Sequence, residues 1–138
     1  MAAEYLFVYG TLRKGFAPGS VLIPQNHVTF IGKGFLQGRL FEVDDYPGAI
    51  LSENPADRVR GEVYSLHEPQ AVLARLDDYE GCGANHPEPH EYKREKHTVS
   101  LEEGGPVMAW VYLFTGPTDS LRRIVSGDYM KFVQGKEG

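Results

Sequence analysis

The chain has 138 residues, of which 41% are hydrophobic and 24% are charged, a composition typical of a folded globular protein. This length predicts one domain with one core, residues 1–138. The net charge of −5 argues against a nucleic-acid partner, because phosphate neutralisation needs a basic face. The sequence has no apolar run long enough for a membrane span, and its one cysteine, Cys82, cannot form an internal disulfide. We therefore expect a cytoplasmic protein.

The predicted elements are mostly short strands. The 16 glycines, 9 prolines and 12% aromatics favour many strands joined by tight turns over a helical bundle. In chain order, strands are expected at residues 5–9, 28–31, 35–43, 49–51, 59–66, 92–101 and 107–114. A Gly32-Lys33-Gly34 turn separates the second strand from the third, and the last two form a hairpin through residues 102–105. A short helix is expected at 119–125, ended by Ser126-Gly127-Asp128-Tyr129.

One segment has a convincing helical pattern, from Pro69 to Glu80. Proline suits the first turn of a helix, Glu68 favours its positive end, and Gly81 supplies a stop. Because strands are many and helices few, we expect an α+β domain in which a curved sheet or small barrel is packed by this helix.

The first strand ends abruptly at a glycine. Residues 5–9 are aromatic, apolar or β-branched, and Gly10, Thr11, Leu12 and Arg13 follow directly. A glycine at the end of a buried strand lets the backbone turn sharply and present its N–H groups to a bound molecule. The alternative is an ordinary turn between a strand and a loop, which the pattern alone leaves open.

A carboxylate falls on the apolar side of the predicted helix. At 100° per residue, Glu80 lies between two leucines, whereas Asp78 lies on the opposite side and Asp77 at the margin. Burial and the negative end of the helix would both raise the pKa of Glu80, as a general base near neutral pH requires. The alternative is a frayed last turn with Glu80 in water. The apolar stripe consists of Val72, Leu73, Leu76 and Tyr79.

Taken together, Tyr9-Gly10-Thr11-Leu12-Arg13 and Asp78-Tyr79-Glu80-Gly81 resemble the gamma-glutamylcyclotransferase-like family, especially its gamma-glutamylamine cyclotransferase branch. The order and spacing of further segments extend the resemblance over most of the chain. These segments are Phe35–Phe41, Tyr46-Pro47-Gly48-Ala49, Val59–Tyr64, Tyr92-Lys93-Arg94 and Ile124–Tyr129.

The resemblance implies a small mixed β-barrel with flanking helices and a defined reaction. A gamma-glutamyl amide is cyclised by its own α-amine, which releases an amine and 5-oxoproline. The family's catalytic glutamate matches Glu80, and its substrate-binding loop matches residues 9–12, from Tyr9 to Leu12. Glu80 would take a proton from the substrate's ammonium group and return it to the departing amine, while loop N–H groups hold an oxyanion or carboxylate. This chemistry needs neither a metal nor an organic cofactor.

Four further residues are candidates for the pocket. Arg13 and Arg94 would pair either with a substrate carboxylate or with Asp77 and Asp78, and the sequence does not choose. Tyr112 and Tyr129 would either line the pocket or serve as core aromatics with a hydroxyl at the surface.

Other interpretations of the sequence carry less weight or stay open. Residues 82–91 contain Cys82, His86, Glu88 and His90, which we interpret as part of a lid rather than a metal site, because prolines separate the histidines. The leaving amine and the oligomeric state are open. The competing functional hypothesis is a non-catalytic module that binds a small anionic metabolite on the same barrel.

Overall fold

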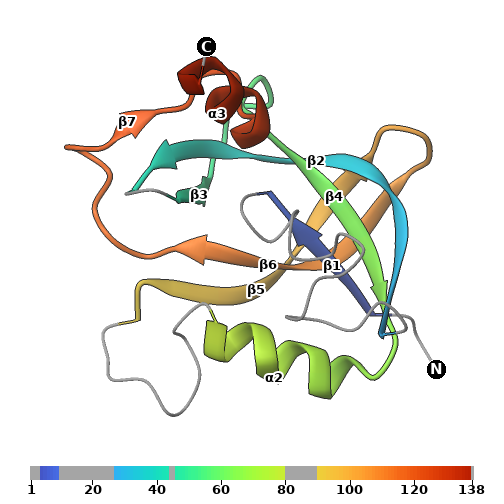
Figure 1. Ribbon diagram of the computed structural model, residues 1–138. Coiled ribbons are helices and arrows are strands. Elements are labelled where there is room, and N and C mark those ends of the chain that lie inside the picture. The colour runs from blue at the N-terminus through green and yellow to red at the C-terminus, as the bar shows by residue number, and fades with distance from the viewer. Residues whose placement is uncertain (1–3, 10–26, 44–45, 80–89, 138) are drawn as a thin grey trace.

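The computed structural model describes residues 4–9, 27–43, 46–79 and 90–137. Its elements, labelled in Figure 1, are seven strands and two helices. They are β1 (Glu4–Val8), β2 (Val28–Glu42), β3 (Pro47–Leu51), β4 (Arg58–Leu66), α2 (Pro69–Tyr79), β5 (Tyr92–Leu101), β6 (Pro106–Phe114), β7 (Arg122–Arg123) and α3 (Tyr129–Glu137). Within the described ranges, no helix is long and apolar enough to span a membrane.

Five strands close into a barrel. Their order is β2–β4–β1–β6–β5, and β5 returns to β2 through the pairs Gly34–Leu101 and Phe35–Ser100. The pairing of β1 with β6, at Leu6 and Trp110, is parallel, and the other barrel pairings are antiparallel. Helix α2 covers one side of the barrel, and α3 lies at the opposite side (Figure 1). The prediction of a small mixed barrel with flanking helices is therefore confirmed.

Strand β2 is continuous over 15 residues, so the predicted turn at Gly32-Lys33-Gly34 is wrong. A bulge between Phe30 and Gly32 bends the strand instead. Gly34 serves close packing, because a Cβ there would lie 2.7 Å from the carbonyl oxygen of Ser100. Its partner on β4, Gly61, would place a Cβ 2.2 Å from the Val8 oxygen. Both glycines thus let neighbouring strands approach closely enough to close the barrel.

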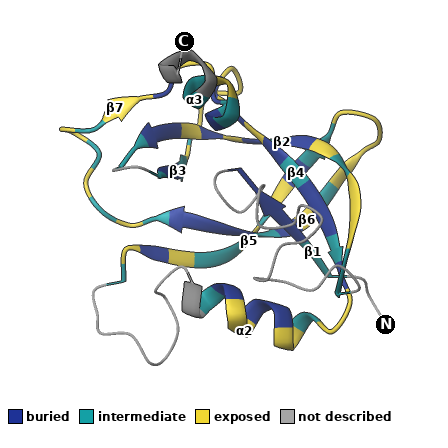
Figure 2. Ribbon diagram, in the orientation of Figure 1, coloured by how far each residue is buried: buried dark blue, intermediate teal, exposed yellow. Residues whose placement is uncertain are grey.

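Two hydrophobic clusters follow from the alternation of side chains along the strands. The first is contributed by every barrel strand and fills the interior; it includes Phe7, Tyr9, Val63 and Val111. The second lies between the outer barrel wall and α2 and includes Leu6, Val8 and Tyr112. Figure 2 shows the buried face of α2 turned toward the barrel and its exposed face turned to solvent.

Helix α2 matches the helix predicted at 69–80, with Glu80 itself outside the described residues. The predicted apolar stripe is confirmed at Val72, Leu73 and Leu76, which are buried. At the other end, Glu68 adopts a left-handed backbone (φ 58°), and its carbonyl accepts a 3.1 Å hydrogen bond from Val72 N–H. The chain therefore enters the helix through a sharp turn.

The helix predicted at 119–125 is wrong. That segment contains β7, whose Arg123 and Arg122 pair with Phe41 and Glu42 of β2. The helix instead starts at Tyr129, directly after the Ser-Gly-Asp segment predicted to stop one. The Asp128 side chain accepts a 3.2 Å hydrogen bond from Lys131 N–H, which caps the first turn of α3.

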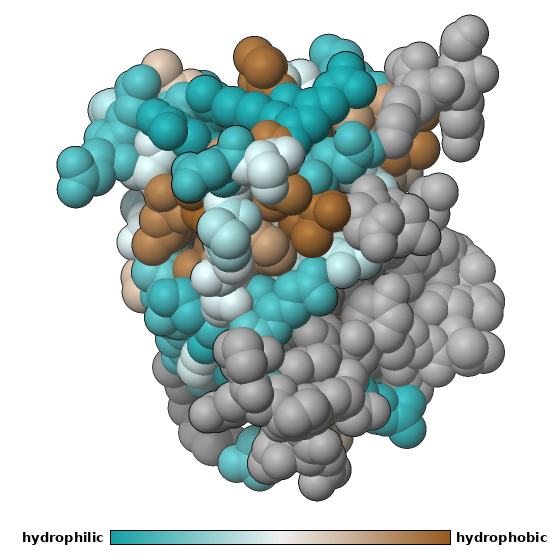
Figure 3. Space-filling model, turned by 90° about the vertical axis from the view of Figure 1, so that its left-hand side faces the viewer, coloured by the Kyte–Doolittle hydropathy of each residue, from teal (hydrophilic) through white to brown (hydrophobic). Residues whose placement is uncertain are grey.

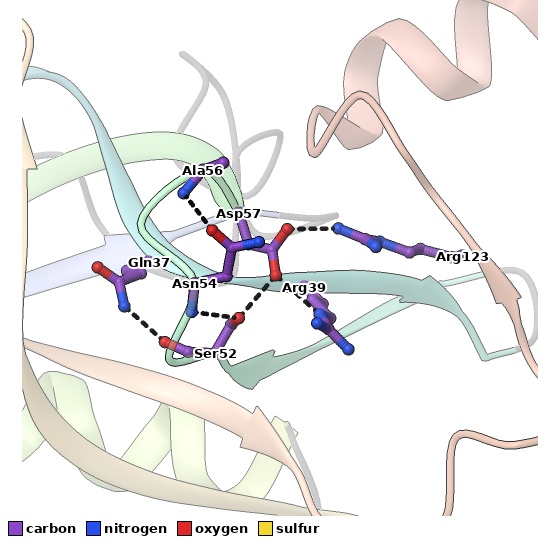
Figure 4. Close-up of polar contacts among 7 residues, drawn as sticks. All are labelled: Gln37, Arg39, Ser52, Asn54, Ala56, Asp57 and Arg123. Carbon is purple, nitrogen blue, oxygen red and sulfur yellow. Dashed lines mark hydrogen bonds and ion pairs between the residues drawn. The ribbon is translucent and has the colours of Figure 1, made fainter.

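A buried carboxylate fastens β7 and the β3–β4 connection to β2 (Figure 4). Asp57 accepts hydrogen bonds from Arg39 at 2.8 Å, from Arg123 at 2.8 Å and from Ser52 at 2.6 Å. These partners hold the pKa of Asp57 well below its usual range: the hydrogen bonds from Ser52 and Arg39 contribute most, and Arg123 adds to them. These contacts hold the three segments together, and they pair the negative charge of Asp57 with two arginines of the fold.

Candidate active site

The site predicted from sequence begins at Tyr9, one residue beyond β1. Its ring is buried in the interior cluster. Its hydroxyl donates a 2.5 Å hydrogen bond to the backbone carbonyl of Tyr112 and accepts one of 3.2 Å from the N–H of Ala49. The phenol therefore ties the end of β1 to β6 and β3. The rest of the predicted loop, Gly10, Thr11 and Leu12, lies outside the described residues, as does Arg13.

The hairpin of β5 and β6 presents one row of side chains toward α2. Tyr112 and Trp110 are two positions apart on β6 and so share a face. Arg94 lies directly opposite Tyr112 in the register, and Lys96 lies opposite Trp110. Arg94 places its guanidinium 4.3 Å from the centre of the Trp110 ring, a cation–π contact that holds the cation against the outer wall.

Asp77, in the last turn of α2, receives three hydrogen bonds from this row. Arg94 binds it in bidentate fashion, from Nε to Oδ1 at 2.7 Å and from Nη2 to Oδ2 at 3.0 Å. The Tyr112 hydroxyl donates to the same Oδ1 at 2.7 Å. The sequence left two partners open for Arg94, a substrate carboxylate or a helix aspartate, and the structure pairs it with Asp77.

Tyr112 thus connects the two halves of the predicted site. Its carbonyl holds Tyr9, and its hydroxyl holds Asp77. Glu80 follows Asp77 by three positions and lies outside the described residues, as do the side chain of Asp78 and most of the predicted lid. The sequence predicted Asp77 only at the margin of the helix's apolar stripe. Its role depends on contacts with strands 17 and 35 positions away, for which the local pattern carries no signal.

Tyr129 lies in a different part of the molecule. It is buried at the start of α3, packs with the interior cluster and stacks on Phe132 at a ring distance of 6.4 Å. The structure therefore brings Arg94 and Tyr112 together with Asp77 and places Tyr129 in the separate cluster that contains Tyr9.

A shallow depression of about 440 Å³ lies where β6 ends. Phe114, two residues after Tyr112, forms part of its wall, and Glu91 supplies a carboxylate that accepts a 2.5 Å hydrogen bond from the Tyr46 hydroxyl. Figure 3 shows this side of the molecule, where hydrophobic groups emerge between polar ones. The lining residues are Val43, His90, Glu91, Phe114, Thr115, Gly116 and Pro117.

Solved structures of other proteins have the same fold, a barrel covered by a helix. The crystal structure of a mouse AIG2-like protein matches with a TM-score of 0.69 and 26% identity, over 94% of this chain and 89% of that one. The chain belongs to the family described as "Gamma-glutamyl cyclotransferase, AIG2-like", whose model matches residues 6–131. Membership of this family makes the protein an enzyme of the cyclotransferase class.

Two curated relatives agree with the family. A Methanocaldococcus jannaschii protein, provisionally named a gamma-glutamylcyclotransferase, is 32% identical over 129 residues, which cover 94% of this chain and 98% of that protein. The rat protein named gamma-glutamylaminecyclotransferase is 32% identical over 125 residues, which cover 78% of this chain and 76% of the relative. The family resemblance found in the sequence is therefore confirmed.

Proposed function

We propose that the protein cyclises a gamma-glutamyl amide and releases an amine and 5-oxoproline. In this reaction the substrate's α-amine attacks the carbonyl carbon of its own side-chain amide. A new C–N bond closes the five-membered ring, and the bond to the departing nitrogen breaks. The attacking nitrogen starts as an ammonium group and gives up two protons, one before the attack and one as the ring closes. Both protons end on the departing nitrogen, which leaves as an ammonium ion, so no further reactant is consumed.

Glu80 is the residue we assign to this proton transfer. The α-amine is protonated near neutral pH and becomes a nucleophile only after it loses a proton. A carboxylate beside it takes that proton and then delivers it to the leaving nitrogen. The family match and the place of Glu80 on the apolar stripe support the assignment.

The loop after β1 is the proposed binding element for the acyl end. Backbone N–H groups of Gly10, Thr11 and Leu12 are suited to hold the developing oxyanion or the substrate's carboxylate, because both are anions that need fixed donors. Tyr9 has a different task in this proposal. Its hydroxyl is engaged by Tyr112 and Ala49, so Tyr9 holds the start of the loop.

One observation carries the proposal beyond family membership: Tyr112 binds both Tyr9 and Asp77. Ring closure depends on holding the glutamyl chain folded against the proton-transfer group, so the two elements must keep a fixed relation. A shared anchor on a barrel strand provides such a relation. A small-molecule substrate, a cytoplasmic location and action without a metal or organic cofactor belong to the same proposal.

The test is release of 5-oxoproline from a panel of gamma-glutamyl amides with amino acid, lysine side-chain and small amine leaving groups. The Glu80→Gln variant is expected to lose this release while its circular dichroism and thermal unfolding stay like those of the wild type. Full activity in the variant would refute the role of Glu80. Binding across the panel without turnover by the wild type would favour the non-catalytic binding module.

A further inference from the structure

We infer that Asp77, Arg94 and Tyr112 are positioning residues. Together they form a clamp that fixes the last turn of α2 relative to the end of β1. The inference rests on the proposed function, in which α2 leads to the proton-transfer residue and β1 leads to the substrate-binding loop. None of the three is assigned a contact with the reacting atoms.

The geometry of the clamp is more restrictive than that of the surface ion pairs on the same barrel. Its Arg94 and Asp77 side chains are only 24% and 21% exposed, whereas the pair Lys93–Glu95 is 55% and 41% exposed. The bidentate guanidinium fixes the plane of the carboxylate, and the Tyr112 hydroxyl adds a third direction. Stacking on Trp110 restrains the guanidinium from its other side.

The end of α2 needs such an external restraint. A carboxylate in the last turn of a helix is opposed by the negative end of the helix dipole. The last turn of α2 has no basic residue to offset Asp77. The compensating cation, Arg94, comes instead from β5 and lies 17 positions away in sequence. The last turn is therefore held by tertiary contact and not by its own sequence.

Tyr112 extends the clamp to the other half of the site. Its hydroxyl and its carbonyl have separate partners, Asp77 and Tyr9. Because both groups belong to one residue of a central barrel strand, a shift of that residue moves both elements together. The Tyr112→Phe substitution removes the hydroxyl that binds Asp77 of α2 and leaves the carbonyl that holds Tyr9.

The experiment compares Asp77→Asn and Tyr112→Phe with the matched control Asp57→Asn. Asp57 is also a carboxylate held by two arginine contacts, but its partners Arg39 and Arg123 tie β7 and β2 rather than α2. Amide hydrogen exchange is followed over the last turn of α2 under native conditions, where local opening dominates. Steady-state kinetics on the best substrate of the panel give kcat and KM separately.

The clamp predicts at least about tenfold faster exchange at the end of α2 in Asp77→Asn and Tyr112→Phe, and wild-type exchange there in Asp57→Asn. It also predicts that kcat falls about tenfold to a hundredfold while KM stays within about twofold. Effects of the two clamp substitutions should be non-additive, because both act on one carboxylate.

The opposite sign of the exchange result would overturn the inference. If Asp77 acted only through the helix dipole, Asp77→Asn would stabilise the last turn and slow its exchange. Unchanged exchange would overturn it equally, whatever the activity. If the wild type turned over no substrate of the panel, the proposed function would be refuted. The exchange measurement would still decide whether the clamp holds α2.

Discussion

The hydroxyl of Tyr9 donates a 2.5 Å hydrogen bond to the carbonyl of Tyr112, a residue 103 positions away. The same hydroxyl accepts from the N–H of Ala49, so one phenol satisfies backbone groups of two strands, β3 and β6. The side chain that ends the first strand is thus part of the barrel's internal framework. The chain therefore leaves β1 from a fixed point.

Removal of the Tyr9 hydroxyl is expected to lower the free energy of unfolding. The Tyr9→Phe variant leaves the N–H of Ala49 and the carbonyl of Tyr112 without this partner in a buried setting, and each such loss costs about 1–3 kcal/mol. Urea unfolding should show a lower midpoint with an unchanged slope. Tyr5→Phe is the matched control, because Tyr5 lies on β1, which ends directly before Tyr9, and its hydroxyl has no hydrogen bond within the described part of the chain. That control should stay within about 0.5 kcal/mol of the wild type.

The close approach of β1 and β4 makes Gly61 sensitive to a single methyl group. In Gly61→Ala the new Cβ would meet the Val8 oxygen at 2.2 Å and the Phe7 ring at 2.7 Å, so the barrel wall must shift. We expect a loss of about 1–3 kcal/mol in the free energy of unfolding, measured by urea titration. Gly105→Ala is the control, since nothing lies within 4 Å of a Cβ at that hairpin position. Equal stability of the two variants would contradict the packing described for β1 and β4.

The cluster around Asp57 makes stability depend on pH in the acid range. The folded state holds the pKa of Asp57 below the value of about 3.9 expected in the unfolded chain. The carboxylate therefore contributes stability that is fully present above that unfolded value and is lost as the pH falls toward the folded one. Urea midpoints of the wild type and Asp57→Asn should differ clearly at pH 7 and converge toward pH 3. A gap that stays constant between these pH values would contradict a folded-state pKa of Asp57 that lies below its unfolded value.

Trp110 offers an optical report on the clamp. It is the one tryptophan of the chain, and Arg94 covers one side of its ring at 4.3 Å. The Arg94→Ala variant should expose that side to water and shift the emission of Trp110 to longer wavelength. Arg58→Ala removes an equivalent stacked arginine, 4.4 Å from the Phe35 ring, and should leave the emission unchanged. An unshifted spectrum in Arg94→Ala would mean that Arg94 does not lie over the indole in solution.

The sequence determined those features that depend on a local repeat. The helix from Pro69 and the hairpin strands at residues 92–101 and 107–114 follow from periods of 3.6 and 2, which neighbouring residues express on their own. The order of the motifs is enough to identify the family, because its segments keep their spacing along most of the chain. Local patterns failed at Gly32–Gly34 and at Ser126–Asp128, where glycine served strand packing and helix entry rather than a turn or a stop.

Only the tertiary structure decided which distant groups meet. The sequence left Arg94 with two possible partners, and the packing of α2 against β5 and β6 brought it to Asp77. It likewise gave Tyr9 no partner, whereas the parallel pairing of β1 and β6 brought its hydroxyl to Tyr112. Both outcomes have one physical reason. Side-chain periodicity records which face of an element is buried, but hydrogen bonds between elements depend on register and closure, which no single segment encodes.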